Sequence, residues 1–173
     1  MIRQHRIDGD RIYVVRHADA GVRTDSPDDH LRPLSSTGNA HARILADRPQ
    51  FAALGDVVSS PYVRCVQTVE PLTARHRRPV SISNTLAKGA PIEAMLRLLR
   101  RLPDGSVACT HGEMLQELVA FIEDFDERDD PISFEKGGVW VLSRVGDELS
   151  LVELQRAPRA TVDDRTVIMS RTA

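Results

Sequence analysis

The chain has 173 residues, a formal net charge of -2 at pH 7 and the composition of an ordinary globular protein. This length allows one domain with a substantial core, and the charge gives no electrostatic reason to expect nucleic acid or a membrane surface as a partner. The start is too polar for a secretory signal, and Cys65 and Cys109 have neither metal-ligand nor disulfide-framework spacing. We therefore expect a cytoplasmic location.

Short apolar runs alternate along the chain with segments of helical spacing. Residues 1–10 have no periodicity and are expected to form a flexible lead-in. The runs are bounded by polar residues, which is typical of buried parallel strands. They predict strands at 12–15, 56–59, 80–83 and 106–110. Helices are expected between and after them, beginning near residues 35, 60, 91 and 112.

The second of these helices has the most specific signals. It is expected to start at Ser60-Pro61, since serine is a good N-cap and proline is tolerated in the first helical turn. Pro71 is expected to break or kink it, because proline lacks the amide hydrogen that continues helical bonding. Its expected inward face consists of Val63, Val66 and Val69.

The C-terminal part of the sequence has a different pattern. The acidic stretch 123–130 is expected to be a solvated connection. Two apolar runs, 139–142 and 149–154, flank Gly146-Asp147 and predict an antiparallel hairpin. Residues 156–173 show no strong pattern and are expected to form a tail of uncertain structure.

Taken together, the alternation of strands and helices predicts an α/β fold. We expect a three-layer α/β/α sandwich with a mostly parallel central sheet and an antiparallel C-terminal hairpin. There is no internal repeat or linker, so residues 11–155 are expected to form a single domain.

Basic and imidazole side chains follow three of the predicted strands. Arg16 and His17 end the first strand, Arg64 lies in the helix after the second, and His111 follows strand 106–110. The carboxyl ends of parallel strands lie at one edge of a sheet, so we expect these four side chains to converge. Guanidinium groups bind phosphate bidentately, and a neutral imidazole among them is a nucleophile that can carry a phosphoryl group.

Four short motifs in this order resemble the histidine phosphatase (phosphoglycerate mutase-like) superfamily, and in particular its small bacterial branch with the SixA-type phosphohistidine phosphatases. The motifs are Arg16-His17-Ala18, Leu34-Ser35-x-x-Gly38, Ser59-Ser60-Pro61-Tyr62-x-Arg64-Cys65-x-Gln67-Thr68 and Thr110-His111-Gly112-Glu113. The resemblance implies a phosphoglycerate mutase-like fold over 11–155 and a phosphatase that needs no metal and no cofactor.

The resemblance also implies roles for individual residues. His17 matches the histidine that is phosphorylated during turnover, and Arg16 and Arg64 match the two arginines that grip the phosphoryl group. His111 matches the second histidine, which donates to the same oxygens. Arg23 lies where the family often has a further polar contact to the phosphate. Positioning and positive charge would then supply most of the catalysis.

The sequence departs from the family where an acidic residue usually protonates the leaving group. The chain reads Leu86-Ala87-Lys88-Gly89 where close relatives are expected to carry Leu-Ala-Glu-Gly. Lysine attracts anions and is therefore a candidate substrate contact, but it is a poor proton donor at neutral pH. Glu113 is the best substitute acid and Asp19 a weaker one. If neither serves, the leaving group must need little protonation, as in a phosphoanhydride, or turnover has been lost.

These observations leave two functions of different classes. The leading hypothesis is a phosphatase acting on a phosphohistidine protein, a small phosphate ester or a nucleotide-derived phosphate. The alternative is a phosphate-binding module with weak or lost turnover, which Lys88 motivates. A cysteine phosphatase is excluded because neither Cys65 nor Cys109 begins a Cys-x5-Arg motif, and both are expected to be buried packing residues.

Overall fold

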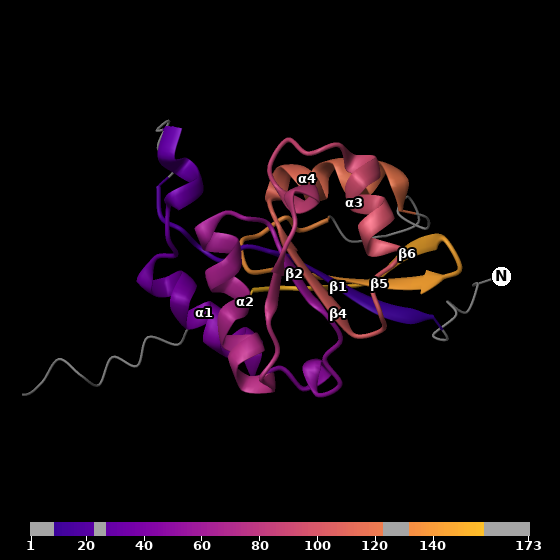
Figure 1. Cartoon of the computed structure of the whole chain (residues 1–173), viewed down its shortest axis with the longest axis horizontal. Helices are drawn as coiled ribbons and strands as arrows, with labels where there is room; N and C mark the ends of the chain where they lie inside the picture. The colour runs from indigo at the N-terminus through magenta and orange to yellow at the C-terminus, as the bar shows by residue number, and fades with distance from the viewer. Residues whose placement is uncertain (1–8, 23–26, 123–131, 158–173) are drawn as a thin grey trace, which may run out of the picture.

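The computed structural model describes residues 9–22, 27–122 and 132–157 and contains one six-stranded sheet of strand order β3-β2-β4-β1-β5-β6 (Figure 1). Strands β1 to β4 are mutually parallel, whereas β5 pairs antiparallel with β1 and forms a hairpin with β6. The strands are β1 (Asp10–Arg16), β2 (Val57–Ser59), β3 (Val80–Ile82), β4 (Ser106–Thr110), β5 (Val139–Val145) and β6 (Glu148–Gln155). The predicted sheet with its C-terminal hairpin is confirmed.

Helices cover both faces of the sheet, so the predicted three layers are confirmed as well (Figure 1). The described α-helices are α1 (Ser36–Ala46), α2 (Val63–His76), α3 (Ile92–Leu99) and α4 (Gly112–Leu118). Short 3-10 turns are η1 (Pro27–Leu31), η2 (Pro49–Phe51), η3 (Asn84–Leu86) and η4 (Val119–Phe121). None of the helices in the described ranges is long and apolar enough to cross a membrane.

Each helical layer packs on its face of the sheet through a separate apolar cluster. On one face α1 and α2 bury Leu45, Val69 and Leu72 against alternate residues of the central strands. On the other face α3 and α4 contribute Met95 and Met114, with further leucines and Trp140 of β5. Alternation of side chains along a strand explains why two clusters form on a sheet that is buried on both sides.

The register of the central strands brings the predicted site residues to the same level. In the parallel pair of β1 and β4, Arg16 is opposite Thr110, and in that of β2 and β4, Ser59 is opposite Cys109. Both cysteines are free thiols and fully buried, as expected from their packing role. The carboxyl ends of β1, β2 and β4 therefore open onto one edge of the sheet.

The start of α2 differs from the sequence prediction. The helix begins at Val63 after Tyr62, which makes no side-chain capping bond, and the Ser60 hydroxyl instead lies 2.9 Å from Nε2 of His111. The same hydroxyl also accepts from the amide of Tyr62 at 3.4 Å, so this serine contacts both the start of α2 and the site histidine.

Pro71 neither breaks nor ends the helix, which continues to His76. The inward face of α2 also differs from the prediction, since Val63 and Val66 are only partly buried. The buried residues of the helix are Arg64, Cys65, Thr68, Val69, Leu72 and Thr73. Burial of Val69 and Leu72 on either side of Pro71 explains the continuity, because tertiary packing overrides local propensity.

Parts of the sequence prediction fall outside the described residues. This applies to the lead-in up to residue 8, to the acidic stretch 123–130 and to the tail from residue 158 onwards. The first residues of the predicted tail are described, and the amide of Ala157 donates to Oε1 of Glu135 at 2.6 Å.

Candidate active site

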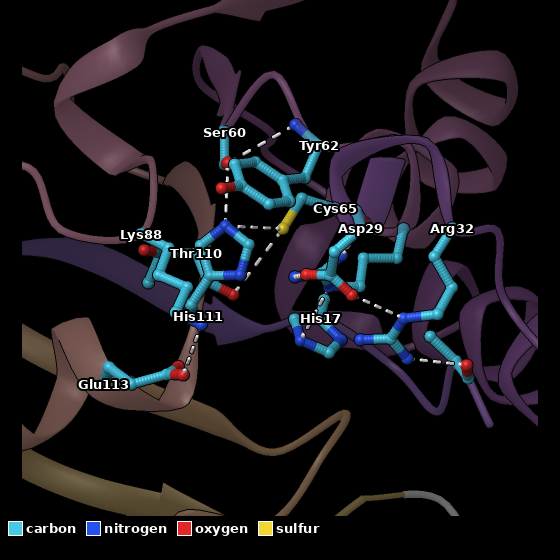
Figure 2. A network of polar contacts seen from close by, with 12 residues as sticks. His17, Asp29, Arg32, Ser60, Tyr62, Cys65, Lys88, Thr110, His111 and Glu113 are labelled. Atoms are coloured by element: carbon cyan, nitrogen blue, oxygen red, sulfur yellow. Dashed lines mark hydrogen bonds and ion pairs between the residues drawn. The ribbon is translucent and has the colours of Figure 1, made fainter. Parts of the chain in front are cut away.

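His17, Arg64 and His111 meet at the carboxyl edge of the sheet. His17 follows β1 directly, and its ring lies edge-on to that of His111, with 5.4 Å between the ring centroids. The Nε group of Arg64 donates to Nε2 of His17 at 3.2 Å. Figure 2 shows His17 with His111 on one side and with Asp29 and Arg32 on the other. All three side chains are almost completely buried.

The surroundings of His17 fix both its tautomer and its charge. Nδ1 lies 2.8 Å from the carbonyl oxygen of Ala18, which can only accept, so Nδ1 carries the proton and Nε2 keeps its lone pair. Burial lowers the pKa of His17 to about 3, the Ala18 bond opposes this shift, and the charges of Arg64, His111 and Arg16 add to it. His17 is thus a neutral imidazole whose unprotonated nitrogen faces a guanidinium.

Arg64 is the second residue of α2, so the helix start at Val63 points its side chain into the site. Two of its nitrogens bind one residue of η1: Nη1 donates to the carbonyl of Asp29 at 2.7 Å and Nη2 to its carboxylate at 3.1 Å. The guanidinium also stacks on the ring of Tyr62, 4.7 Å from its centroid. Arg64 is thereby held on three sides.

Arg16 ends β1 and its guanidinium lies against Gly112, at the start of α4. A Cβ atom on Gly112 would come 2.8 Å from Cζ of Arg16, so only glycine leaves room for this side chain. Nη1 donates to the Phe134 carbonyl, while Nε is buried and has no hydrogen-bond partner within the described ranges. Burial lowers the pKa of Arg16 and Glu113 opposes this. A buried donor without a partner needs an explanation, and an anion bound beside Arg16 would supply the missing acceptor.

His111 is held by residues that the sequence analysis did not assign to the site. Its Nε2 lies 2.9 Å from the Ser60 hydroxyl and 3.6 Å from Sγ of Cys65, and the Tyr62 ring packs against it with 4.6 Å between centroids. The motif Ser59-Ser60-Pro61-Tyr62 is the sequence signal for these contacts. On its own it predicts a helix start, because serine is a good N-cap.

Lys88 and Glu113 form an ion pair at the rim of the site, with 3.6 Å between Nζ and Oε1 (Figure 2). The loop after η3 carries Lys88, and the first turn of α4 carries Glu113. Both side chains are partly exposed and are therefore accessible from the solvent. Arg23, the further predicted substrate contact, lies outside the described residues.

Asp19, the weaker candidate for the acid, is engaged elsewhere. Its carboxylate accepts from Nζ of Lys136 at 2.7 Å and from the Ser35 hydroxyl at 2.6 Å. These two bonds hold the pKa of Asp19 well below its usual value, although burial opposes them. A carboxylate held in this way does not supply a proton near neutral pH.

Two hydrogen-bonded side chains connect the elements of the site, and sequence reasoning missed them. Thr68, fully buried in α2, accepts from the amide of Ala18 at 2.9 Å and donates to the carbonyl of Arg64 at 2.7 Å. Asp29 binds Arg64 and also accepts from Nε of Arg32 at 2.8 Å. Thr68 ends the motif quoted above, but the motif does not reveal its bond to Ala18, and the local Asp29–Arg32 pair does not reveal the bond to Arg64, because both partners are distant in the sequence.

The arrangement suits a tetrahedral oxyanion. Two guanidinium groups and an imidazole donor can surround its oxygens, and the lone pair of His17 faces the same space. Within the described ranges, no group of three or more His, Cys, Asp and Glu side chains is placed to hold a metal ion. Fold and site together define an α/β protein with histidine and arginine side chains gathered at the carboxyl edge of its sheet.

Comparison with known proteins agrees with this class. Residues 12–88 match the family model of the histidine phosphatase superfamily (branch 1). In a search of solved structures, SixA from Agrobacterium tumefaciens superimposes with a TM-score of 0.69 at 26% identity, covering 87% of this chain and 99% of that one. The chain therefore matches the histidine phosphatase superfamily over residues 12–88 and shares its fold with SixA over most of its length.

Two further relatives differ more from this chain, one in length and the other in sequence. The 8-oxo-(d)GTP phosphatase of Mycolicibacterium smegmatis is 31% identical over 152 residues, which cover 83% of this chain and 47% of that protein. The chain thus spans about half the length of the curated relatives that it matches. The protein histidine phosphatase SixA, solved with tungstate, has a TM-score of 0.70 at 18% identity over 84% of this chain and 96% of that one, which shows the fold alone.

Proposed function

We propose that the protein is a phosphatase that works through a covalent phosphohistidine on His17. The observation that carries this proposal is the state of His17, a neutral imidazole whose Nε2 lone pair faces Nε of Arg64 at 3.2 Å. A nucleophile must be unprotonated, and it must lie beside the group that binds the phosphate it attacks. Both conditions are met at the same atom.

In the first step, the lone pair of Nε2 forms a bond to phosphorus while the bond from phosphorus to the leaving oxygen breaks. Arg16 and Arg64 bind the oxygens on which charge is spread, and the buried Nε of Arg16 gains a partner. If the Ser60 hydroxyl donates to Nε2 of His111, the proton of that ring is on Nδ1 and is available to the phosphate. In the second step, the oxygen of a water molecule forms a bond to phosphorus while the bond from phosphorus to Nε2 breaks and returns its electron pair to His17. Inorganic phosphate then leaves with both hydrogens of the water.

The relatives suggest the class of substrate for the proposal. The curated relative is an 8-oxo-(d)GTP phosphatase and the structural ones are SixA proteins, so we propose a nucleotide-derived phosphate, a small phosphate ester or a phosphohistidine protein as substrate. We assign the activity to a single domain over 11–155. The free thiols of Cys65 and Cys109 support a reducing compartment such as the cytoplasm.

The nucleophile can be tested by replacing His17 with asparagine. Because Asn cannot accept the phosphoryl group, hydrolysis of acetyl phosphate or p-nitrophenyl phosphate in EDTA should fall by about a thousandfold or more. Wild-type protein quenched with denaturant at alkaline pH should carry label from a 32P donor that later acid treatment removes, and His17→Asn should carry none. A variant that keeps its rate, or its label, would show that another group is the nucleophile.

The alternative function is a phosphate-binding module that has lost efficient turnover. Lys88 favours it, because an ammonium group is a poor acid at neutral pH and here it is paired with Glu113, the best substitute acid. Wild-type protein that binds phosphate but turns over none of the donors above would support the module and contradict the phosphatase.

The role of the rim can be tested by Lys88→Glu. The new carboxyl would lie beside Glu113, and two neighbouring carboxylates raise each other's pKa, so one of them can act as an acid. We expect hydrolysis of alkyl phosphate esters to rise by about tenfold or more, with little change for acetyl phosphate. Lys88→Gln is the control, since it removes the cation without adding an acid. Equal ester rates in the two variants would contradict this assignment.

A further inference from the structure

The guanidinium of Arg64 uses its two edges differently. One edge, formed by Nη1 and Nη2, is occupied by Asp29, through the carbonyl at 2.7 Å and the carboxylate at 3.1 Å. Nε, on the other edge, donates to Nε2 of His17 at 3.2 Å. Asp29 therefore binds the terminal nitrogens of Arg64, and Nε stays directed at the nucleophile that would carry the phosphoryl group.

Asp29 is itself held in place by Arg32. Oδ1 of Asp29 accepts from Nε of Arg32 at 2.8 Å, and Nη1 of Arg32 donates to the carbonyl of Ala20 at 2.7 Å. The other carboxylate oxygen binds Arg64, so each oxygen of Asp29 has an arginine partner. The chain of contacts runs from the loop after β1 through η1 to α2.

These contacts solve a physical problem at the site. Arg64 is only 3% exposed, and a long flexible side chain must be fixed there if its charge is to meet the phosphate in one geometry. Burial would raise the pKa of Asp29, but the bond from Arg32 and the charge of Arg64 outweigh it, so the pKa lies below its usual value. Asp29 is therefore charged at neutral pH.

We propose that Asp29, anchored by Arg32, is a positioning residue that directs the Nε edge of Arg64 toward the phosphoryl group on His17. The proposal rests on the function proposed above and assigns no contact between Asp29 and the substrate. A competing view is that the carboxylate competes with phosphate for Arg64. The two views predict opposite effects when the charge is removed.

The test compares Asp29→Asn with Asp47→Asn. Asp47 pairs with Arg75 at the exposed surface and is a matched control, since the same change is made to an arginine-paired aspartate far from the site. For Asp29→Asn we expect kcat on acetyl phosphate to fall by about 10- to 100-fold, and binding of orthovanadate, which imitates the transition state, to weaken more than binding of inorganic phosphate. Arg32→Gln should cause a smaller loss of the same kind.

A double substitution separates positioning from a general structural role. In an Arg64→Ala background, Asp29→Asn should have no further effect on orthovanadate binding, because the group that it positions is gone. An equal loss in both backgrounds, or tighter phosphate binding by Asp29→Asn, would overturn the proposal. Wild-type protein that neither turns over nor binds orthovanadate would overturn the proposed function and this inference together. An active wild type with an unchanged Asp29→Asn variant would overturn the inference alone.

Discussion

The mechanism that we propose requires a neutral His17 imidazole beside the two arginines of the site. Burial, with the neighbouring Arg64, His111 and Arg16 as smaller causes, lowers its pKa to about 3, so nearly all of it remains a free base even in mildly acidic solution. At its reference pKa of about 6.5, a histidine would be mostly protonated at about pH 5 and could not attack phosphorus. The environment thus extends the pH range of the nucleophile downward.

The same shift predicts how stability depends on pH. The pKa of His17 in the folded chain, about 3, is below its unfolded value near 6.5, so between these values the unfolded chain binds a proton that the folded chain does not. The contribution of His17 is therefore complete above about pH 6.5 and is lost as the pH falls toward 3. The expected slope in this window approaches about 1.4 kcal/mol per pH unit.

Urea unfolding of the wild type and of His17→Gln between about pH 7 and 4 measures this effect. The variant lacks the titrating group, so the stability of the wild type relative to the variant should decrease as the pH is lowered. Parallel curves for the two proteins would mean that His17 titrates normally in the folded state.

Among the elements, the end of β1 and the start of α2 must keep a fixed distance, because His17 directly follows β1 and Arg64 lies in the first turn of α2. Thr68 connects them through its bonds to the Ala18 amide and the Arg64 carbonyl. Valine at this position has nearly the same shape but leaves the buried amide without a partner. Thr68→Val should therefore cost about 1–3 kcal/mol of unfolding free energy and lower the phosphatase rate.

Thr68→Ser is the matched control, since it keeps the hydroxyl and removes only a methyl group. Denaturant unfolding and p-nitrophenyl phosphate hydrolysis of both variants measure the two effects. If the serine variant lost as much activity as the valine variant, packing of the methyl group rather than the hydroxyl would explain the result.

The elements also differ in how well they could be predicted. Strand β4 is a strongly apolar run and has the predicted bounds, and helix α3 begins within one residue of the predicted position 91. Helix α2 was predicted less well, because it begins three residues after Ser60 and continues through Pro71.

At the scale of the whole molecule, the strand order decides which residues meet. Strand β4 lies between β1 and β2, so the segments after all three strands are neighbours although residues 17, 64 and 111 are far apart in the chain. The two apolar clusters on opposite faces of the sheet hold this order. A local change at the carboxyl edge can therefore alter the site without changing the core.

The sequence by itself determined the alternation of strands and helices, the hairpin and the four motif residues, because these follow from local periodicity and from residue chemistry at strand ends. Only the tertiary structure decided that Asp29, itself bound by Arg32, holds Arg64. It also decided that Ser60 hydrogen-bonds His111 and that Lys136 donates to Asp19. Such partners are chosen by distance and by the need of each buried polar group for a bond, and neither is encoded in the spacing of residues along the chain.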